Sequence, residues 1–218
     1  MTVESSHISR RRFLHSLGLA VPAIAGLPLI SAGSSTQRPA LSAPDLRFIA
    51  RELPLRRRHE WARVQPNPER LREATADGYN RITLHHAGTD VIRFTSESSV
   101  VSCLDGVLGG HLQRRFGDVG YHFLIDYAGR VWEGRSLAYW GAHVSGHNEH
   151  NVGIVLLGNF EKQRASRAQI QSMQKLVGLV RDHYAIRPGA IYGHIDLGRT
   201  LCPGRYLYPQ VQRLNQLA

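Results

Sequence analysis

Three side chains in this sequence could together bind a metal ion: His85, His194 and Cys202. They stand where runs of residues that predict β-strands give way to loops. Two imidazoles and a thiolate are ligands that zinc prefers, and three protein ligands leave a fourth tetrahedral position open, as in catalytic zinc sites. Isolated histidines and cysteines are also common core residues, so the spacing alone leaves a metal site and a packed interior both open.

The pattern of apolar residues predicts the elements that must position these side chains. Strands are expected where β-branched and aromatic residues gather, and helices where apolar residues recur every three or four positions. The expected strands are 81–84, 121–126, 130–133, 151–157 and 190–193, and the expected helices are 96–116 and 166–184, with Ser166 as an N-cap. This alternation of strands and helices favours an α/β domain.

Five segments resemble, in order, the motifs of one known family: 82–89, 118–125, 129–135, 141–154 and 193–204. The sequences ITLHHAGT, DVGYHFLI and GHIDLGRTLCPG within them resemble the ligand and tyrosine segments of type-2 N-acetylmuramoyl-L-alanine amidases. That family includes the peptidoglycan recognition proteins. The resemblance implies a single α/β domain over residues 56–218, with a central mixed β-sheet flanked by helices. It also implies hydrolysis of the amide bond between N-acetylmuramic acid and L-alanine in peptidoglycan.

The resemblance assigns the metal and the catalytic roles to individual residues. His85, His194 and Cys202 would hold Zn²⁺. Tyr121 would be the catalytic tyrosine, and Thr200 would help it to stabilise the oxyanion formed from the attacked carbonyl. Many relatives carry Asp at the position of the cysteine, and some carry Lys at that of the threonine. The chain therefore resembles the recognition-protein and phage-type branch of the family.

The segment that resembles the substrate groove supplies further candidates. Trp140, His143 and Asn148 are expected to contact the peptidoglycan substrate. Two other histidines have simpler expected roles, because side chains alternate along a strand. His86 is expected to point away from the ligand side, and His122 is expected to pack within the sheet.

Two functions stay open within this family, a zinc amidase and a recognition module that only binds peptidoglycan. Loss of the third metal ligand marks non-catalytic relatives. Cys202, both ligand histidines and Tyr121 are present here. The sequence therefore favours an enzyme, with the recognition module as the alternative.

Residues 1–33 are expected to be an export signal. Arg10 and Arg11 precede an apolar stretch over 14–30 and then small residues, which is the order of a twin-arginine signal. The stretch is interrupted by proline and glycine and is shorter than the roughly 20 residues of a stable membrane span. An uncleaved anchor is the alternative interpretation. Residues 34–55 are expected to be a linker, and the mature protein is expected in the periplasm, the extracellular space or the cell wall.

The chain is strongly basic, with 27 Lys and Arg against 17 Asp and Glu over 218 residues, a formal charge of +10. Three arginines and one glutamate in residues 1–33 account for +2 of this, so the remainder carries +8. A basic surface attracts polyanions, including anionic wall polymers and nucleic acids. The export signal and the lack of a recognisable DNA-reading motif in the sequence argue against nucleic acid. With only two cysteines, Cys103 and Cys202, the sequence excludes a disulfide scaffold. We also expect the protein to be a monomer.

Overall fold

The structure is a computed structural model that describes residues 45–75 and 78–217. The expected export signal over 1–33 lies outside the described residues. In the described part of the chain, no helix has the length and apolar character needed to cross a membrane.

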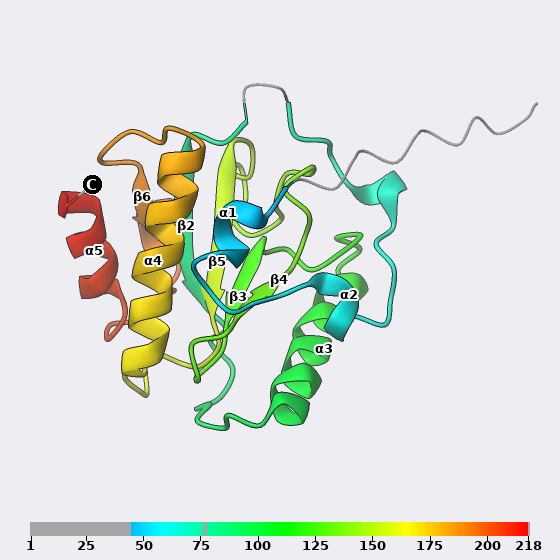
Figure 1. The fold of residues 1–218 in the computed structure, drawn as a ribbon, viewed down its shortest axis with the longest axis horizontal. Helices are drawn as coiled ribbons and strands as arrows, with labels where there is room; N and C mark the ends of the chain where they lie inside the picture. Colours follow the sequence, from blue (N-terminus) through cyan, green and yellow to red (C-terminus); the bar gives the residue numbers. More distant parts are fainter. Residues whose placement is uncertain (1–44, 76–77, 218) are drawn as a thin grey trace, which may run out of the picture. The chain divides into compact units, whose positions relative to one another are not determined.

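The centre of the fold is a six-stranded mixed β-sheet (Figure 1). In chain order the strands are β1 (Leu55–Arg56), β2 (Arg81–His86), β3 (Phe123–Ile125), β4 (Val131–Glu133), β5 (Asn151–Leu156) and β6 (Ile191–Gly193). Their order across the sheet is β1-β4-β3-β5-β2-β6. Strands β3 and β4 form an antiparallel hairpin, whereas the other neighbouring pairs are parallel. The central mixed sheet of the predicted α/β fold is therefore confirmed.

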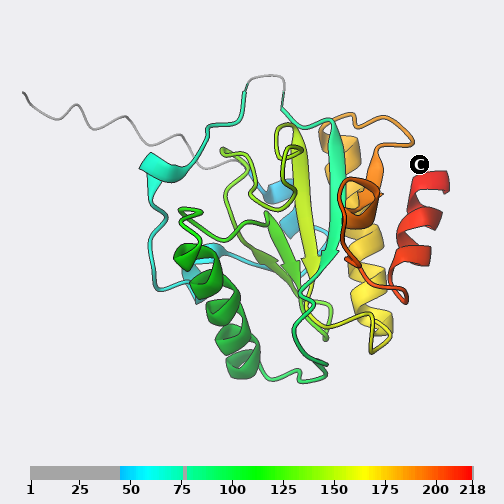
Figure 2. The same ribbon diagram turned by 180° about the vertical axis from the view of Figure 1, so that it is seen from behind.

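Helices cover both faces of the sheet (Figures 1 and 2). Helices α1 (Arg47–Ala50), α4 (Arg167–His183) and α5 (Tyr208–Leu217) contribute to one buried apolar cluster. Helices α2 (Arg58–Trp61) and α3 (Glu97–Gln113) contribute to a second cluster. Two 3₁₀ turns, η1 (Pro68–Arg70) and η2 (His194–Asp196), complete the described elements. The apolar stripes of the helices and the two faces of the sheet thus form two cores.

Alternation along the strands decides which face each side chain occupies. On β5, Ile154 lies in the first cluster and Val155 in the second, as expected for successive residues of a strand. On β2, Ile82 and Leu84 lie in the first cluster. The next side chain, His85, therefore faces the other side of the sheet, where α3 packs.

The seven predicted strands and helices are all present, with ends that differ by at most three residues. The predicted cap of α4 is also present, because Ser166 Oγ accepts the backbone N–H of Gln169 at 3.0 Å. The described part of the expected linker is folded instead. Leu46 and Ile49 are buried in the first cluster, and β1 pairs with β4. The folded domain therefore includes residues 45–55, which contain a four-residue helix and the first residue of the two-residue strand β1, and both elements are too short to show a period.

Candidate metal and substrate site

The register of two parallel strands brings the two candidate histidines together. On β2 and β6, Leu84 lies opposite Gly193, so the residues that follow them lie side by side near the carboxyl ends of the two strands. These residues are His85, the fifth residue of β2, and His194, the first residue of η2. The centroids of their rings are 4.8 Å apart. A separation of more than 100 residues in the sequence is thus closed by one strand pairing.

The loop after η2 returns the candidate thiol to the same place. The backbone N–H of Ile195 donates to the carbonyl oxygen of Cys202 at 2.7 Å, which closes the loop. Two residues later, Gly204 adopts φ +93°, and a Cβ there would lie 2.5 Å from the carbonyl carbon of Phe160. Only glycine permits this approach of the two backbones. The loop is therefore held against the segment that follows β5.

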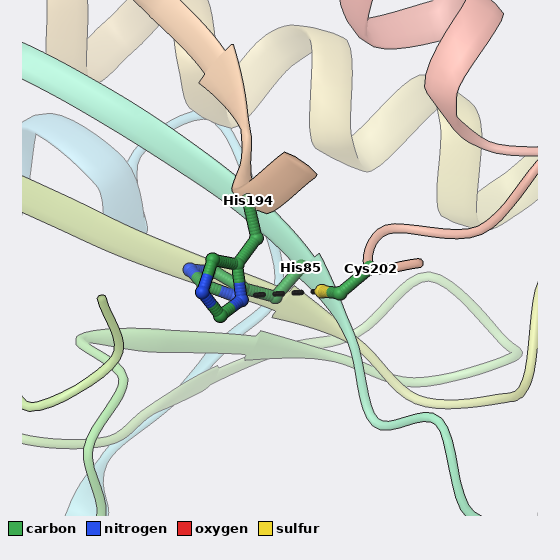
Figure 3. A group of neighbouring side chains, drawn as sticks. All are labelled: His85, His194 and Cys202. Carbon is green, nitrogen blue, oxygen red and sulfur yellow. Dashed lines mark hydrogen bonds between the residues drawn. The ribbon is translucent and has the colours of Figure 1, made fainter. Parts of the chain in front are cut away.

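The three candidate ligands point toward one another (Figure 3). Their ligand atoms all lie within 4.8 Å of one another. Cys202 Sγ lies 3.6 Å from His85 Nδ1 and accepts the backbone N–H of His86 at 3.4 Å. The His86 ring points elsewhere, and its Nδ1 accepts the backbone N–H of Phe160 at 3.1 Å. His86 thus supports the sulfur through its backbone rather than through its imidazole.

In the metal-free protein, burial favours the neutral form of the two imidazoles and the protonated form of the Cys202 thiol. Burial lowers the pKa of His85 far below its ordinary value, and it also lowers the pKa of His194. It raises the pKa of the Cys202 thiol to about 12, against the opposing effect of the His86 N–H. Neutral imidazoles are the form that ligates metals, and a bound cation favours the thiolate. Two nitrogens and one sulfur that converge in this way fit zinc.

A hollow of about 390 Å³ opens beside the cluster. Its lining includes His111, Arg114, Tyr121, His143, Asn148 and His194. The ring centroid of Tyr121 lies 5.1 Å from that of His85. Burial raises the pKa of the tyrosine, so its phenol keeps its proton and can donate a hydrogen bond. The hollow thus places a donor beside the candidate metal ligands.

The other predicted site residues have contacts within the protein. Thr200 Oγ1 accepts the backbone N–H of Cys202 at 3.1 Å, so this threonine shapes the ligand loop. Asn148 Oδ1 accepts the backbone N–H groups of His143 and Val144 at 2.8 and 2.9 Å. Trp140 is buried in the first apolar cluster and, together with Asn148, lines a second hollow of about 260 Å³.

His122, which was expected to pack within the sheet, and His143, which was expected to contact substrate, are both buried. His122 is enclosed in the sheet, where its Nδ1 accepts the backbone N–H of Gly153 at 3.0 Å, which confirms the packing role. His143 is 8% exposed, and burial lowers its pKa to about 3. Both of its ring nitrogens lie within hydrogen-bond distance of protein atoms, at His85 and Asn151. The side chain expected to bind substrate is therefore tied to a candidate metal ligand.

Three residues in the last turn of α3 and just after it line the hollow and were missed in the sequence: His111, Arg114 and Phe116. For His111 the sequence did contain an indication, because this residue continues the buried face of α3 after Leu104 and Leu108. A histidine at the end of an otherwise apolar stripe indicates a polar group that faces an internal partner. Here its Nδ1 accepts the backbone N–H of residue 120 at 2.9 Å.

Comparisons with known proteins agree with this geometry. Residues 75–205, more than half of the chain, match the Amidase_2 family model, described as N-acetylmuramoyl-L-alanine amidase. Peptidoglycan-recognition protein SC2 of Drosophila melanogaster is 30% identical over 131 residues, which cover 59% of this chain and 70% of that protein. A human N-acetylmuramoyl-L-alanine amidase is 34% identical over 100 residues, which cover 43% of this chain and only 16% of the human protein.

A solved structure shares the fold. The crystal structure of Drosophila peptidoglycan recognition protein SD matches with a TM-score of 0.67 and 25% identity, over 74% of this chain and 95% of that one. The fold is thus that of the peptidoglycan recognition and amidase class of α/β domains. The chain belongs to the type-2 N-acetylmuramoyl-L-alanine amidase family. The matched names include both an amidase and recognition proteins, so the residues of the site must distinguish between hydrolysis and binding.

Proposed function

We propose that this protein is a zinc-dependent N-acetylmuramoyl-L-alanine amidase that acts on peptidoglycan after export. The observation that carries the proposal is the convergence of His85, His194 and Cys202, with ligand atoms within 4.8 Å of one another, beside a hollow that also contains Tyr121. A module that only binds peptidoglycan needs the hollow, but it has no use for a buried cluster of three zinc-type ligands.

The side chains of the cluster have separate tasks in this proposal. His85, His194 and Cys202 would hold the zinc ion. Bound zinc supplies Lewis acidity, which polarises a carbonyl group and lowers the pKa of water toward about 7. His194 lines the hollow, whereas His85 is almost fully buried, so the hollow would bring the substrate to the His194 side of the cluster.

The reaction adds water across one amide bond. The water oxygen bonds to the lactyl carbonyl carbon of N-acetylmuramic acid, the C–N bond breaks, and the amine of L-alanine leaves with an added proton. Negative charge develops on the carbonyl oxygen in between. The protonated phenol of Tyr121 would donate a hydrogen bond to that oxygen, and donors placed in this way stabilise the transition state. Thr200 would support this arrangement through the ligand loop that it holds.

Digestion of purified peptidoglycan, followed by mass spectrometry, tests this proposal. With zinc-loaded protein we expect stem peptides that begin with a free L-alanine amine and glycan strands that carry free lactyl carboxylates. A chelator should stop their release, and added zinc should restore it. If the zinc-loaded protein binds the polymer and leaves every such amide intact, the protein is a recognition module and the proposal is wrong.

A further inference from the structure

We propose that His143 is a positioning residue, which fixes the tautomer and the orientation of the candidate metal ligand His85. The inference rests on the zinc site of the proposed function and adds a role for a side chain outside the ligand set. It adds a contact with the candidate metal ligand to the substrate contact predicted for His143, which also lines the hollow.

The hydrogen-bond partners of His143 determine which of its ring nitrogens carries the hydrogen. His143 Nε2 lies 3.1 Å from the backbone carbonyl oxygen of Asn151. A carbonyl oxygen can only accept, so Nε2 carries the hydrogen of that bond. In the described part of the chain, none of the hydrogen-bond partners of His143 is a carboxylate, and a buried imidazolium without a counter-charge is costly. The ring is therefore neutral, and its Nδ1 is left as an acceptor.

The acceptor nitrogen of His143 in turn determines which ring nitrogen of His85 carries a hydrogen. His85 Nε2 lies 3.0 Å from His143 Nδ1. Because that Nδ1 accepts, His85 carries its hydrogen on Nε2 and donates it. The lone pair of His85 is then on Nδ1, which is the atom 3.6 Å from Cys202 Sγ. A metal-binding histidine commonly donates its other ring N–H to such a partner, which fixes both its tautomer and its ring orientation.

The fold builds a slot for the His143 ring. A Cβ on Gly141 would collide with Cδ2 of the His143 ring, and a Cβ on Gly153 would collide with the same atom. Both positions therefore need glycine to leave room for the imidazole. The backbone of His143 is held in addition by the side chain of Asn148, at 2.8 Å.

Asn151, whose backbone carbonyl oxygen accepts the hydrogen bond of His143, is itself held by its side chain. The side-chain oxygen of Asn151 accepts the hydroxyl hydrogen of Thr83 at 3.0 Å, and its amide nitrogen donates to the carbonyl oxygen of His147 at 2.8 Å. Asn151 is fully buried at the start of β5. Contacts within the protein thus hold Asn151 and His143, the two residues that connect to His85 in this hydrogen-bonded series.

Metal titration of matched variants of the full chain tests the proposal. His143→Leu removes the acceptor, and we expect the affinity for zinc to fall about 10–100-fold. His143→Asn places an amide oxygen near the position of Nδ1 and should restore most of that loss. His111→Leu removes another buried histidine of the same hollow, one with its Nδ1 bonded to a backbone N–H, and it should leave zinc affinity unchanged. If zinc affinity in His143→Leu equals that of the wild type, the proposal is overturned.

Nitrogen-15 NMR of the imidazoles in metal-free protein separates this inference from the proposed function. We expect both His85 and His143 to carry their hydrogen on Nε2 in the wild type. In His143→Leu, the signals of His85 should shift toward a mixture of the two tautomers. This readout needs neither zinc nor hydrolysis, so it holds its meaning even if peptidoglycan stays intact. A wild-type His85 with its hydrogen on Nδ1 would contradict the positioning role.

Discussion

Replacement of Cys202 by serine is expected to remove bound zinc and to abolish peptidoglycan hydrolysis. The sulfur is one of three ligand atoms that converge within 4.8 Å, and its loss leaves two neutral imidazoles as the proposed ligands. Loss of a partner that only orients a ligand costs about 10–100-fold in metal affinity, and loss of a ligand itself should cost more. We therefore expect zinc affinity to fall by more than about 100-fold. Metal content after dialysis and the release of stem peptides measure the two effects.

The chain supplies its own control for this variant. Cys103 is the other cysteine of the sequence, and it is a free, half-buried thiol that packs on α3 against the second apolar cluster. Cys103→Ser should keep both zinc and hydrolysis, because Cys103 belongs to neither the cluster nor the hollow. Circular dichroism should show that both variants are folded. A folded Cys202→Ser protein that binds zinc and cuts peptidoglycan as the wild type does would refute the assigned ligand.

Replacement of Tyr121 by phenylalanine is expected to slow hydrolysis by about 10²–10³-fold while zinc stays bound. The phenylalanine ring fills the same space, so the contact with His85, at 5.1 Å between ring centroids, should persist. What is lost is the phenolic O–H, which burial keeps protonated. Removal of one donor to a developing oxyanion has an effect of this size in other hydrolases.

The kinetic pattern of this variant distinguishes catalysis from binding. A donor that acts only in the transition state should lower kcat and kcat/KM by similar factors. If instead KM rises and kcat is unchanged, Tyr121 binds the substrate equally in both states and the catalytic assignment is wrong. Zinc content equal to that of the wild type shows that the effect does not arise from the metal site.

The sequence predicted the sheet and its flanking helices because their apolar patterns are long enough to read. Both α3 and α4 show several turns of helical spacing, and β5 is a continuous apolar run. The ends of β2 and β6 followed from these patterns, which placed His85 and His194 at strand ends. The proximity of these two histidines could not be predicted from the sequence, because it depends on the parallel pairing of Leu84 with Gly193.

Other parts of the site depend on tertiary contacts that leave no local pattern. The return of Cys202 requires the close approach of Gly204 to Phe160, from segments about 40 residues apart. The proposed positioning role of His143 depends on two glycines and one carbonyl that come from different strands and loops. Sequence resemblance gave this segment a substrate contact, which stays a prediction, but a motif does not show which way a ring nitrogen faces, so the contact between His143 and His85 could not be predicted.

The central claim is that two imidazoles and one thiolate of this chain hold a single zinc ion. X-ray absorption at the zinc edge of the loaded protein tests that claim directly. We predict one sulfur at about 2.3 Å and two protein nitrogens at about 2.0–2.1 Å from the zinc, with the remaining position taken by a light atom. A first shell without sulfur, or one with two or more sulfurs, would contradict the claim.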